Sequence, residues 1–286
     1  MIDTVSLTNG TLEVEFCLPD KAYQGTRFDH GGIVKQIKLN AHTFLGKERT
    51  KAGIGTGGFG LMHGWLYTDA RNYEGNTFSI LGVGVLANNS EQKPYDFRQR
   101  YSVLQPCCIS MSDRHEDSIG FLETQENAVI SRNYVLQGKT LTITTTLTNT
   151  GKERLAVEEF NHNFFCFDNR RIGREYLLTT DYPLKVKVVR GHIELGAAGY
   201  RPLSFDEALG TTALTTEGYQ QSKKCTTTLC NFKSRTKVTL TDYFTPSRTY
   251  HWLSPWSFCP EVFKLLELDE GRSEQFIRAI TIDEIG

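Results

Sequence analysis

Several features that mark other protein classes are missing from this chain of 286 residues. Lysine and arginine number 32 against 33 aspartate and glutamate, and no basic run is present. This balance gives no electrostatic footprint for a nucleic acid. No apolar stretch approaches the roughly 20 residues that a membrane-spanning helix needs. We therefore expect neither a nucleic-acid partner nor a membrane.

Targeting and metal-binding signals are equally sparse. Residues 1–4 show neither the basic nor the apolar region of a secretory signal peptide. The seven cysteines are odd in number, scattered, and form no CxxC pair. We expect reduced thiols and a cytoplasmic protein without a metal site or a cofactor. A homo-oligomer is compatible with the sequence.

Strand periodicity dominates the chain. Residues 140–147 (TLTITTTL), 183–189 (PLKVKVV) and 237–244 (KVTLTDYF) alternate apolar with polar side chains, the pattern of half-buried strands. Residues 11–17 and 32–39 predict two further strands. Glycine-containing turns separate these runs. The sequence therefore predicts an all-β protein.

Helical periodicity is scarce, and residues 205–209 are the one short helical turn that we expect. No linker, repeat or low-complexity tract divides the chain. We therefore predict a single domain over residues 1–286, built from two large packed antiparallel sheets.

A histidine within an aromatic segment is the first candidate for chemistry. In residues 159–165 (EFNHNFF), alternation sets His162 on one face of a strand together with flanking aromatic rings, and Asn161 on the other face. A histidine held near neutral pKa suits proton transfer. The alternative is a core histidine that bonds to a neighbouring backbone group.

A carboxylate near tryptophans is the second candidate. Glu261 follows Trp252 and Trp256 and precedes a strand-like run over residues 262–268. A glutamate beside apolar side chains has a raised pKa and can act as a base. Pro260 predicts a strand start or a sheet edge. Alternatively, Glu261 is a solvated surface residue in front of structural tryptophans.

Two glycine-rich segments complete the candidates. In residues 24–32 (QGTRFDHGG), Arg27 can bind hydroxyl or phosphate oxygens, or it can pair with Asp29 across a sheet. Residues 53–64 (GIGTGGFGLMHG) match neither nucleotide-binding glycine motif. They predict a loop that lines a cleft, with His63 as a contact.

Together these segments resemble the galactose mutarotase (aldose 1-epimerase) superfamily over nearly the whole chain. Residues 147–150 (LTNT) and 161–165 (NHNFF) are similar to its Thr-Asn turn and its Asn-His-x-Phe/Tyr-Phe segment. Residues 259–261 (CPE) and 269–273 (DEGRS) are similar to its C-terminal Cys-x-Glu and the turn that follows. Residues 26–29 (TRFD) resemble a less characterised bacterial branch.

The resemblance implies a β-supersandwich that interconverts the α and β anomers of an aldose, free or phosphorylated, without a cofactor. One group removes the C1 hydroxyl proton while another protonates the ring oxygen, and the opened chain rotates and closes again. The resemblance implies His162 as the acid and Glu261 as the base, facing one cleft with the sugar between them. The substrate-binding candidates are Arg27, Asp29, His63, Asn161, Trp252 and Trp256.

Other functions remain open. A glycoside hydrolase or lyase on this fold requires a second carboxylate beside Glu261, and Asp168 and Asp242 are available. A non-catalytic sugar-binding protein would keep the aromatic side chains and Arg27 without depending on His162. A purely structural β-sandwich would lack a cleft. The sequence also departs from the family, because its Leu-His-Gly-Gly stretch and its substrate-binding aspartate have no clear match here.

Overall fold

Strands form most of the protein in the computed structural model, which describes residues 4–19, 22–49, 56–88 and 95–285. Within these ranges the helical elements are two 3-10 segments, η1 (Ala70–Tyr73) and η2 (Phe167–Asn169). The all-β prediction is confirmed. Residues 205–209 form a turn rather than the expected helical turn, because the chain reverses at once into the next strand.

The first of two large antiparallel sheets, here sheet I, has the strand order β1-β2-β3-β5-β13-β22-β21-β18-β15, with β4 paired to β3. Its strands are β1 (Thr4–Thr8), β2 (Leu12–Cys17), β3 (Val34–Leu39), β4 (His42–Thr43), β5 (Leu61–Tyr67), β13 (Leu155–Asn163), β15 (Lys185–Arg190), β18 (Thr212–Glu217), β21 (Arg248–Ser254) and β22 (Ser257–Leu268).

The second, sheet II, has the order β16-β17-β14-β19-β20-β23-β12-β11-β10-β9. Its strands are β9 (Cys108–Arg114), β10 (Ser118–Gln125), β11 (Ala128–Gln137), β12 (Thr140–Asn149), β14 (Tyr176–Thr180), β16 (His192–Gly196), β17 (Gly199–Ser204), β19 (Cys225–Asn231), β20 (Thr236–Asp242) and β23 (Ser273–Glu284). A small third sheet contains β6 (Thr77–Ile80), β7 (Gly84–Ala87) and β8 (Val103–Pro106).

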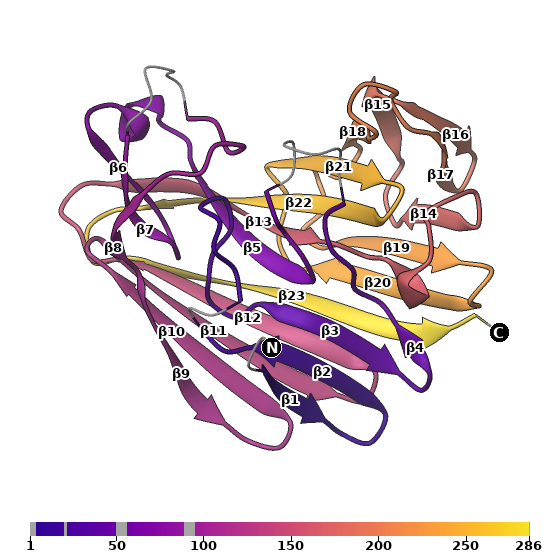
Figure 1. The fold of residues 1–286 in the computed structure, drawn as a ribbon, viewed down its shortest axis with the longest axis horizontal. Coiled ribbons are helices and arrows are strands. Elements are labelled where there is room, and N and C mark those ends of the chain that lie inside the picture. The colour runs from indigo at the N-terminus through magenta and orange to yellow at the C-terminus, as the bar shows by residue number, and fades with distance from the viewer. Residues whose placement is uncertain (1–3, 20–21, 50–55, 89–94, 286) are drawn as a thin grey trace.

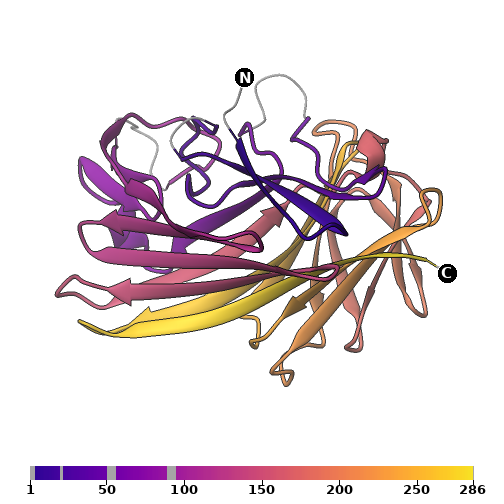
Figure 2. The same ribbon diagram turned by 90° about the horizontal axis from the view of Figure 1, so that it is seen from below.

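The two large sheets lie one over the other, as the two views in Figures 1 and 2 show. The main core fills the space between them. Phe16 of β2 contacts Phe121 and Tyr134 of sheet II, with ring centroids 6.0 and 5.0 Å apart. The predicted strand over residues 140–147 is β12, and its alternate residues face this core. The period-two pattern therefore reports burial against the opposite sheet.

A separate apolar cluster covers the other face of sheet I. Phe160 of β13 and Phe263 of β22 belong to it, whereas Val157 and Leu266 of the same strands join a core cluster shared with sheet II. Since successive side chains of a strand point to opposite faces, this divides sheet I into an inner face toward sheet II and an outer face. The outer cluster includes Phe28 and forms the surroundings of the candidate site.

All seven cysteines are free thiols. No helix of the described residues is long and apolar enough to cross a membrane, since the helices are two short 3-10 segments.

Candidate active site

The hydrogen-bonded ladder between β13 and β22 is interrupted in the middle of sheet I. Regular pairing stops after Phe160 and Phe263, and a single bridge joins Phe165 to Phe258 further along. The register is the same on both sides of the interruption. The strands therefore separate over a short stretch and rejoin without a shift.

His162 and Glu261 lie opposite each other in this opening. The His162 Nε2 atom is 3.4 Å from Glu261 Oε1. Each residue is only 2% exposed, so the alternative of a solvated surface Glu261 does not hold. The separation leaves no room for a sugar ring between the two side chains, contrary to our expectation, so a sugar would lie over both of them.

Pro260 lies in the same opening, and the prediction of a strand start or sheet edge for it was wrong. It is the fourth of the twelve residues of β22, which runs between β13 and β21. Proline has no N–H to donate to a ladder and is disfavoured in a central strand. The interruption explains how it fits, because β22 makes no regular pairs with β13 at this point.

Aromatic rings surround His162. Its ring stacks on Phe164 at a centroid distance of 4.3 Å and meets Phe28 edge-on at 5.2 Å. Trp252 lies at 5.7 Å. This burial, with a smaller contribution from the charge of Arg27, lowers the pKa of His162 well below its ordinary value of 6.5. The imidazole is therefore neutral at neutral pH, and its Nδ1 has no hydrogen-bond partner among the described residues.

Burial has the opposite effect on the carboxyl group of Glu261. It raises the pKa of Glu261 from 4.5 to about 8, although Arg27 and Arg248 act to lower it. Glu261 is therefore largely protonated at neutral pH while His162 is neutral. Burial thus favours the protonated form of Glu261 and the neutral form of His162. This order of proton affinities favours Glu261 as the proton donor, whereas the resemblance implies His162 in that role.

A recess on the outer face of sheet I reaches Glu261, whereas His162 lies behind its lining. Its lining includes Arg27, Arg98, Arg190, Tyr250, Trp252 and Glu261, and its volume is about 70 Å³. It shares Arg27, Phe97 and Arg98 with an adjoining hollow of about 390 Å³, so the two lie side by side. Two larger surface hollows, of about 720 and 810 Å³, do not include Glu261 in their lining.

Strand pairing explains why the recess has an aromatic wall. In the β21–β22 ladder, Tyr250 is paired with Glu261 and Trp252 with Cys259, so both rings lie on the outer face beside His162 and Glu261. From the opposite side, the Arg27 guanidinium lies 4.7 Å from the Phe28 ring centroid and 4.3 Å from that of Phe97. Two cation–π contacts thus hold Arg27 at the recess.

No family model matches the chain, and no curated protein matches it in sequence. Solved structures do match. A candidate aldose 1-epimerase from Escherichia coli K12 superposes with a TM-score of 0.61 at 14% identity, covering 100% of both chains. A galactose mutarotase-like protein from Lactobacillus casei gives 0.59 at 13% identity, covering 98% of this chain and 100% of its own. A galactose mutarotase related enzyme from Lactobacillus acidophilus gives 0.59 at 14%, covering 99% and 100%.

The chain has the galactose mutarotase fold. The predicted β-supersandwich is thereby confirmed, and at these identities the likeness concerns the fold alone.

Within this mutarotase fold, His63 does not reach the recess. In the β5–β13 ladder it is paired with Asn161 and therefore points to the inner face, away from His162. Its Nδ1 is 2.9 Å from Glu159 Oε1 and its Nε2 is 2.9 Å from the Tyr134 hydroxyl. The expected substrate contact is thus a buried structural residue. Residues 53–55 of the predicted cleft loop lie outside the described residues.

Asp29 is likewise buried away from the recess and does not pair with Arg27. Its carboxylate accepts hydrogen bonds from Trp65 Nε1 at 2.9 Å, Arg132 Nη2 at 2.7 Å and the Gly31 amide at 2.8 Å. Although burial acts in the opposite direction, the Arg132 guanidinium lowers the pKa of Asp29. The predicted sugar contact is therefore the centre of an internal ion-pair cluster.

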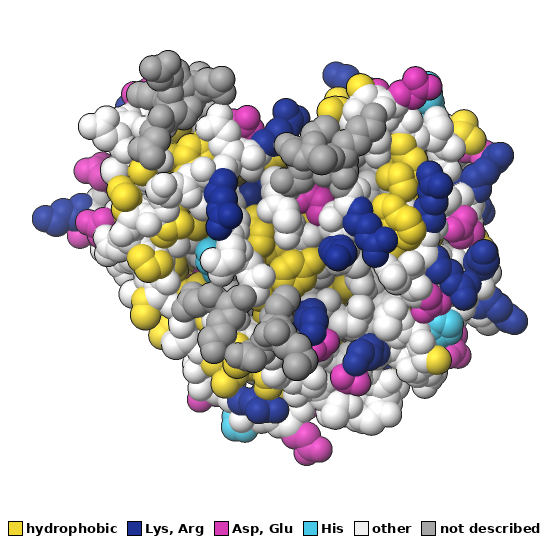
Figure 3. Space-filling view, in the orientation of Figure 1, with side chains coloured by type: hydrophobic (Ala, Val, Ile, Leu, Met, Phe, Trp, Pro, Cys, Tyr) yellow, Lys and Arg dark blue, Asp and Glu magenta, His cyan; other side chains and the backbone are white. Residues whose placement is uncertain are grey.

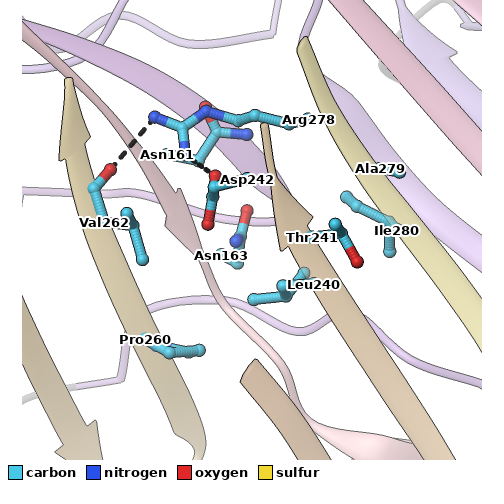
Figure 4. A pocket seen from close by; sticks show the side chains of 10 residues that line it. All are labelled: Asn161, Asn163, Leu240, Thr241, Asp242, Pro260, Val262, Arg278, Ala279 and Ile280. Atoms are coloured by element: carbon cyan, nitrogen blue, oxygen red, sulfur yellow. Dashed lines mark hydrogen bonds and ion pairs between the residues drawn. The ribbon is translucent and has the colours of Figure 1, made fainter. Parts of the chain in front are cut away.

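Asn161 faces a small cavity on the inner side of the opening, which Figure 4 shows with Asn163, Asp242 and Arg278. The cavity measures about 10 Å³, enough for about one water molecule and far too small for a sugar. Arg278 donates a hydrogen bond to Asp242 there. Neither Asn161 nor Asp242 is therefore placed to bind a substrate that sits in the recess.

Two further candidates lie elsewhere. The Trp256 ring is covered by the Arg49 guanidinium at 4.4 Å and does not line the recess, so the predicted stacking role passes to Trp252 alone. Asp168 is 3.1 Å from His42 Nδ1 and is also absent from the lining. Glu48 is the other carboxylate in the lining, and its Oε2 accepts hydrogen bonds from the amide and hydroxyl of Thr56 at 2.7 and 2.9 Å.

Sequence reasoning missed seven of the ten lining residues: Glu48, Phe97, Arg98, Arg190, Leu209, Thr211 and Tyr250. Tyr250 was detectable, because it stands two residues before Trp252 and shares its face by alternation. Arg98 and Arg190 gave no local signal. No group of histidine, cysteine and acidic side chains in the described ranges is arranged to hold a metal ion.

Proposed function

We propose that this protein is an aldose 1-epimerase in which Glu261 and His162 exchange protons with the anomeric centre of a sugar. The observation that carries the proposal is the buried pair itself, His162 and Glu261 3.4 Å apart, with Glu261 in the lining of a recess. Titratable groups whose surroundings push their proton affinities away from ordinary values are typical of catalytic sites.

The short separation fits this chemistry. The ring oxygen and the C1 hydroxyl oxygen of a pyranose are bonded to the same carbon, so two adjacent side chains can reach both. Glu261 donates its proton to the ring oxygen while His162 Nε2 accepts the C1 hydroxyl proton, and the C1–O5 bond breaks to give the open aldehyde. After rotation about C1–C2, the transfers run in reverse and restore both side chains.

The remaining lining supports the same function. Positioned proton transfer supplies about 10²- to 10⁴-fold per group, which is substantial for a reaction that already proceeds in water. Tyr250 and Trp252 offer flat apolar surfaces for the C–H face of a sugar. Arg27 lies near enough to both groups to affect their protonation and would orient the hydroxyl groups.

Anomer exchange measured by NMR across a panel of aldoses tests this proposal. The wild-type protein should exchange the anomers of at least one aldose faster than buffer does, and Glu261→Gln should remove most of the gain. Sugar binding without exchange above the buffer rate would instead identify a binding protein. Release of new reducing ends from glycosides would identify a hydrolase.

A further inference from the structure

Arg27 and Phe28 reach the candidate site from a segment without regular structure. Among the described residues 22–33, none belongs to a strand or a helix. Arg27 nevertheless lines the recess, and the Phe28 ring meets the His162 ring edge-on at a centroid distance of 5.2 Å. Because no strand ladder holds this segment along its length, contacts of neighbouring side chains have to fix the two residues.

Asp29, the next residue along the chain, makes such contacts toward sheet II. Its carboxylate accepts hydrogen bonds from Arg132 Nη2 at 2.7 Å, Trp65 Nε1 at 2.9 Å and the Gly31 amide at 2.8 Å. Its own amide donates a hydrogen bond to the His63 carbonyl at 3.0 Å. Trp65 and His63 belong to β5, whereas Arg132 belongs to β11 of sheet II. Asp29 therefore ties the segment to both large sheets.

Arg132 is held on its other side by a second carboxyl group. Its Nη1 donates a hydrogen bond to Glu123 of β10, which is also buried. Burial raises the pKa of Glu123 well above its ordinary value of 4.5. Although burial opposes it, Arg132 lowers the pKa of Asp29. Glu123 is therefore the neutral member of this cluster, and the ion pair joins Asp29 to Arg132.

Close packing leaves the Asp29 carboxyl group one position. A Cβ atom on Gly82 would overlap this carboxyl group, and a Cβ atom on Gly31 would overlap the Glu123 side chain. The His30 amide donates a hydrogen bond to the Gly82 carbonyl at 3.1 Å, so the turn between β6 and β7 lies against the segment. Asp29 therefore cannot shift without displacing backbone.

This ion pair provides geometry more than stability. Desolvation of two buried charges offsets much of their attraction, so a buried ion pair is a weak source of stability. The pair does give one defined position to a carboxylate that receives three hydrogen bonds. Only one residue separates Asp29 from Arg27, so a displacement of Asp29 is passed along the backbone to Arg27.

We propose that Asp29 and Arg132 are positioning residues for the candidate site. Their ion pair keeps Arg27 at the recess and Phe28 against His162. This inference rests on the proposed function for the reaction that these residues serve, but not for the geometry that they maintain. Figure 3 shows several basic side chains near the middle of the face that Figure 1 presents, so the charge at the recess depends on where each of them lies.

The pKa of Glu261 reports the position of Arg27. Burial raises this pKa to about 8, and Arg27 and Arg248 are the charges that act to lower it. Carbon-13 NMR of the side-chain carboxyl group measures it without any substrate. Arg27→Gln removes one of the two charges, so it should raise the pKa above the wild-type value and provides the benchmark.

Asp29→Asn should reproduce most of this shift. Its NH2 group would face a hydrogen-bond donor at one of the two oxygen positions, which displaces the segment. In the double variant, Asp29→Asn should add little to the effect of Arg27→Gln, because both act through the same guanidinium group. If the protein exchanges anomers, Asp29→Asn should also lower kcat/KM at least about tenfold per folded molecule.

Two further variants separate positioning from a general loss of stability. Arg132→Lys keeps the charge but not the fork that reaches both carboxyl groups, so it should shift the pKa of Glu261 in the same direction. Asp242→Asn is the matched control, because Asp242 is a buried carboxylate bonded to Arg278 and none of residues 26–32 lines its cavity. It should leave the pKa of Glu261 unchanged.

The failure of this inference is distinguishable from that of the proposed function. Loss of stability in Asp29→Asn and Arg132→Lys with an unchanged pKa of Glu261 would overturn the inference, because the ion pair would then be structural alone. An equal shift in Asp242→Asn would overturn it as well. The expected shifts in a protein that exchanges no anomers would support the inference and refute the epimerase.

Discussion

Two buried histidine–glutamate pairs lie on opposite faces of sheet I. On the inner face, His63 Nδ1 is 2.9 Å from Glu159 Oε1. On the outer face, His162 Nε2 is 3.4 Å from Glu261 Oε1. Glu159 and His162 belong to the same strand, β13, three residues apart. The two pairs therefore share residue types, burial and scaffold.

Their surroundings differ. Glu159 also accepts a hydrogen bond from Arg278 Nη2 at 2.5 Å, and His63 has Tyr134 as a second partner. Although burial opposes it, Arg278 together with His63 lowers the pKa of Glu159. Within the described ranges no arginine or lysine forms an ion pair with Glu261, and burial raises its pKa to about 8 although Arg27 and Arg248 act to lower it. Neighbouring charge thus distinguishes the inner pair from the outer pair that we propose to be reactive.

The inner pair depends most strongly on Arg278, which serves both Glu159 and Asp242. Arg278→Met should lower the free energy of unfolding by about 3–5 kcal/mol, because it leaves two buried carboxylates without a counter-charge. Urea denaturation measures this loss. Arg154→Gln, at a surface ion pair, should cost less than about 1 kcal/mol. Equal losses in the two variants would show that the inner network is not what stabilises the fold.

Urea denaturation also tests the domain prediction. The largest core cluster contains residues of both sheets, including Phe16 of β2 and Phe121 of β10. We therefore propose that residues 1–286 unfold in one cooperative transition. Two separate transitions would indicate two domains.

Because of the outer pair, the free energy of unfolding of the protein should fall as pH rises. The folded protein holds the Glu261 proton up to about pH 8, whereas an ordinary glutamate releases it near 4.5. Between these values the wild-type protein loses stability as pH rises. Glu261→Gln removes this loss. The free energy of unfolding of the variant, relative to that of wild type, should therefore grow by up to about 2 kcal/mol from pH 6.5 to 8.

Glu159→Gln is the matched control, because the pKa of Glu159 is lowered. This variant replaces a paired carboxylate and should be less stable than wild type throughout the same window. If the stability difference between Glu261→Gln and wild type stays constant with pH, Glu261 is ionised in the folded protein, as Glu159 is.

Substitution of the two histidines should have different effects on the rate of anomer exchange. His162→Gln should slow anomer exchange at least about tenfold, while sugar binding changes little, because a proton acceptor is lost and a polar group is kept. His63→Gln should leave exchange per folded molecule near the wild-type rate and affect mainly stability. A larger loss of exchange from His63→Gln than from His162→Gln would assign the catalytic role to the inner face.

The strands were predictable because their signal is local. Alternation over residues 140–147 corresponds to β12, and it requires no knowledge of the strands beside it. The same alternation predicted that His162 lies on one strand face together with its flanking aromatic rings. In both cases, the information lies within one short segment.

The faces of His63 and Asn161 required non-local information. The side that a strand residue faces depends on register, and a shift by one residue reverses it. His63 points inward because it is paired with Asn161 across β5 and β13, a pairing of segments about a hundred residues apart. Arg190 reaches the recess through pairs that join β15, β18 and β21. No local pattern contains these pairings.

The pH dependence of anomer exchange tests the central claim that Glu261 and His162 act as a pair holding one proton. The wild-type kcat/KM should be bell-shaped, with an alkaline limb near pH 8 from Glu261 and an acidic limb below pH 6.5 from His162. Glu261→Gln should remove the alkaline limb from the residual activity. A profile that stays flat from pH 5 to 9, or an alkaline limb that survives in Glu261→Gln, would contradict the account.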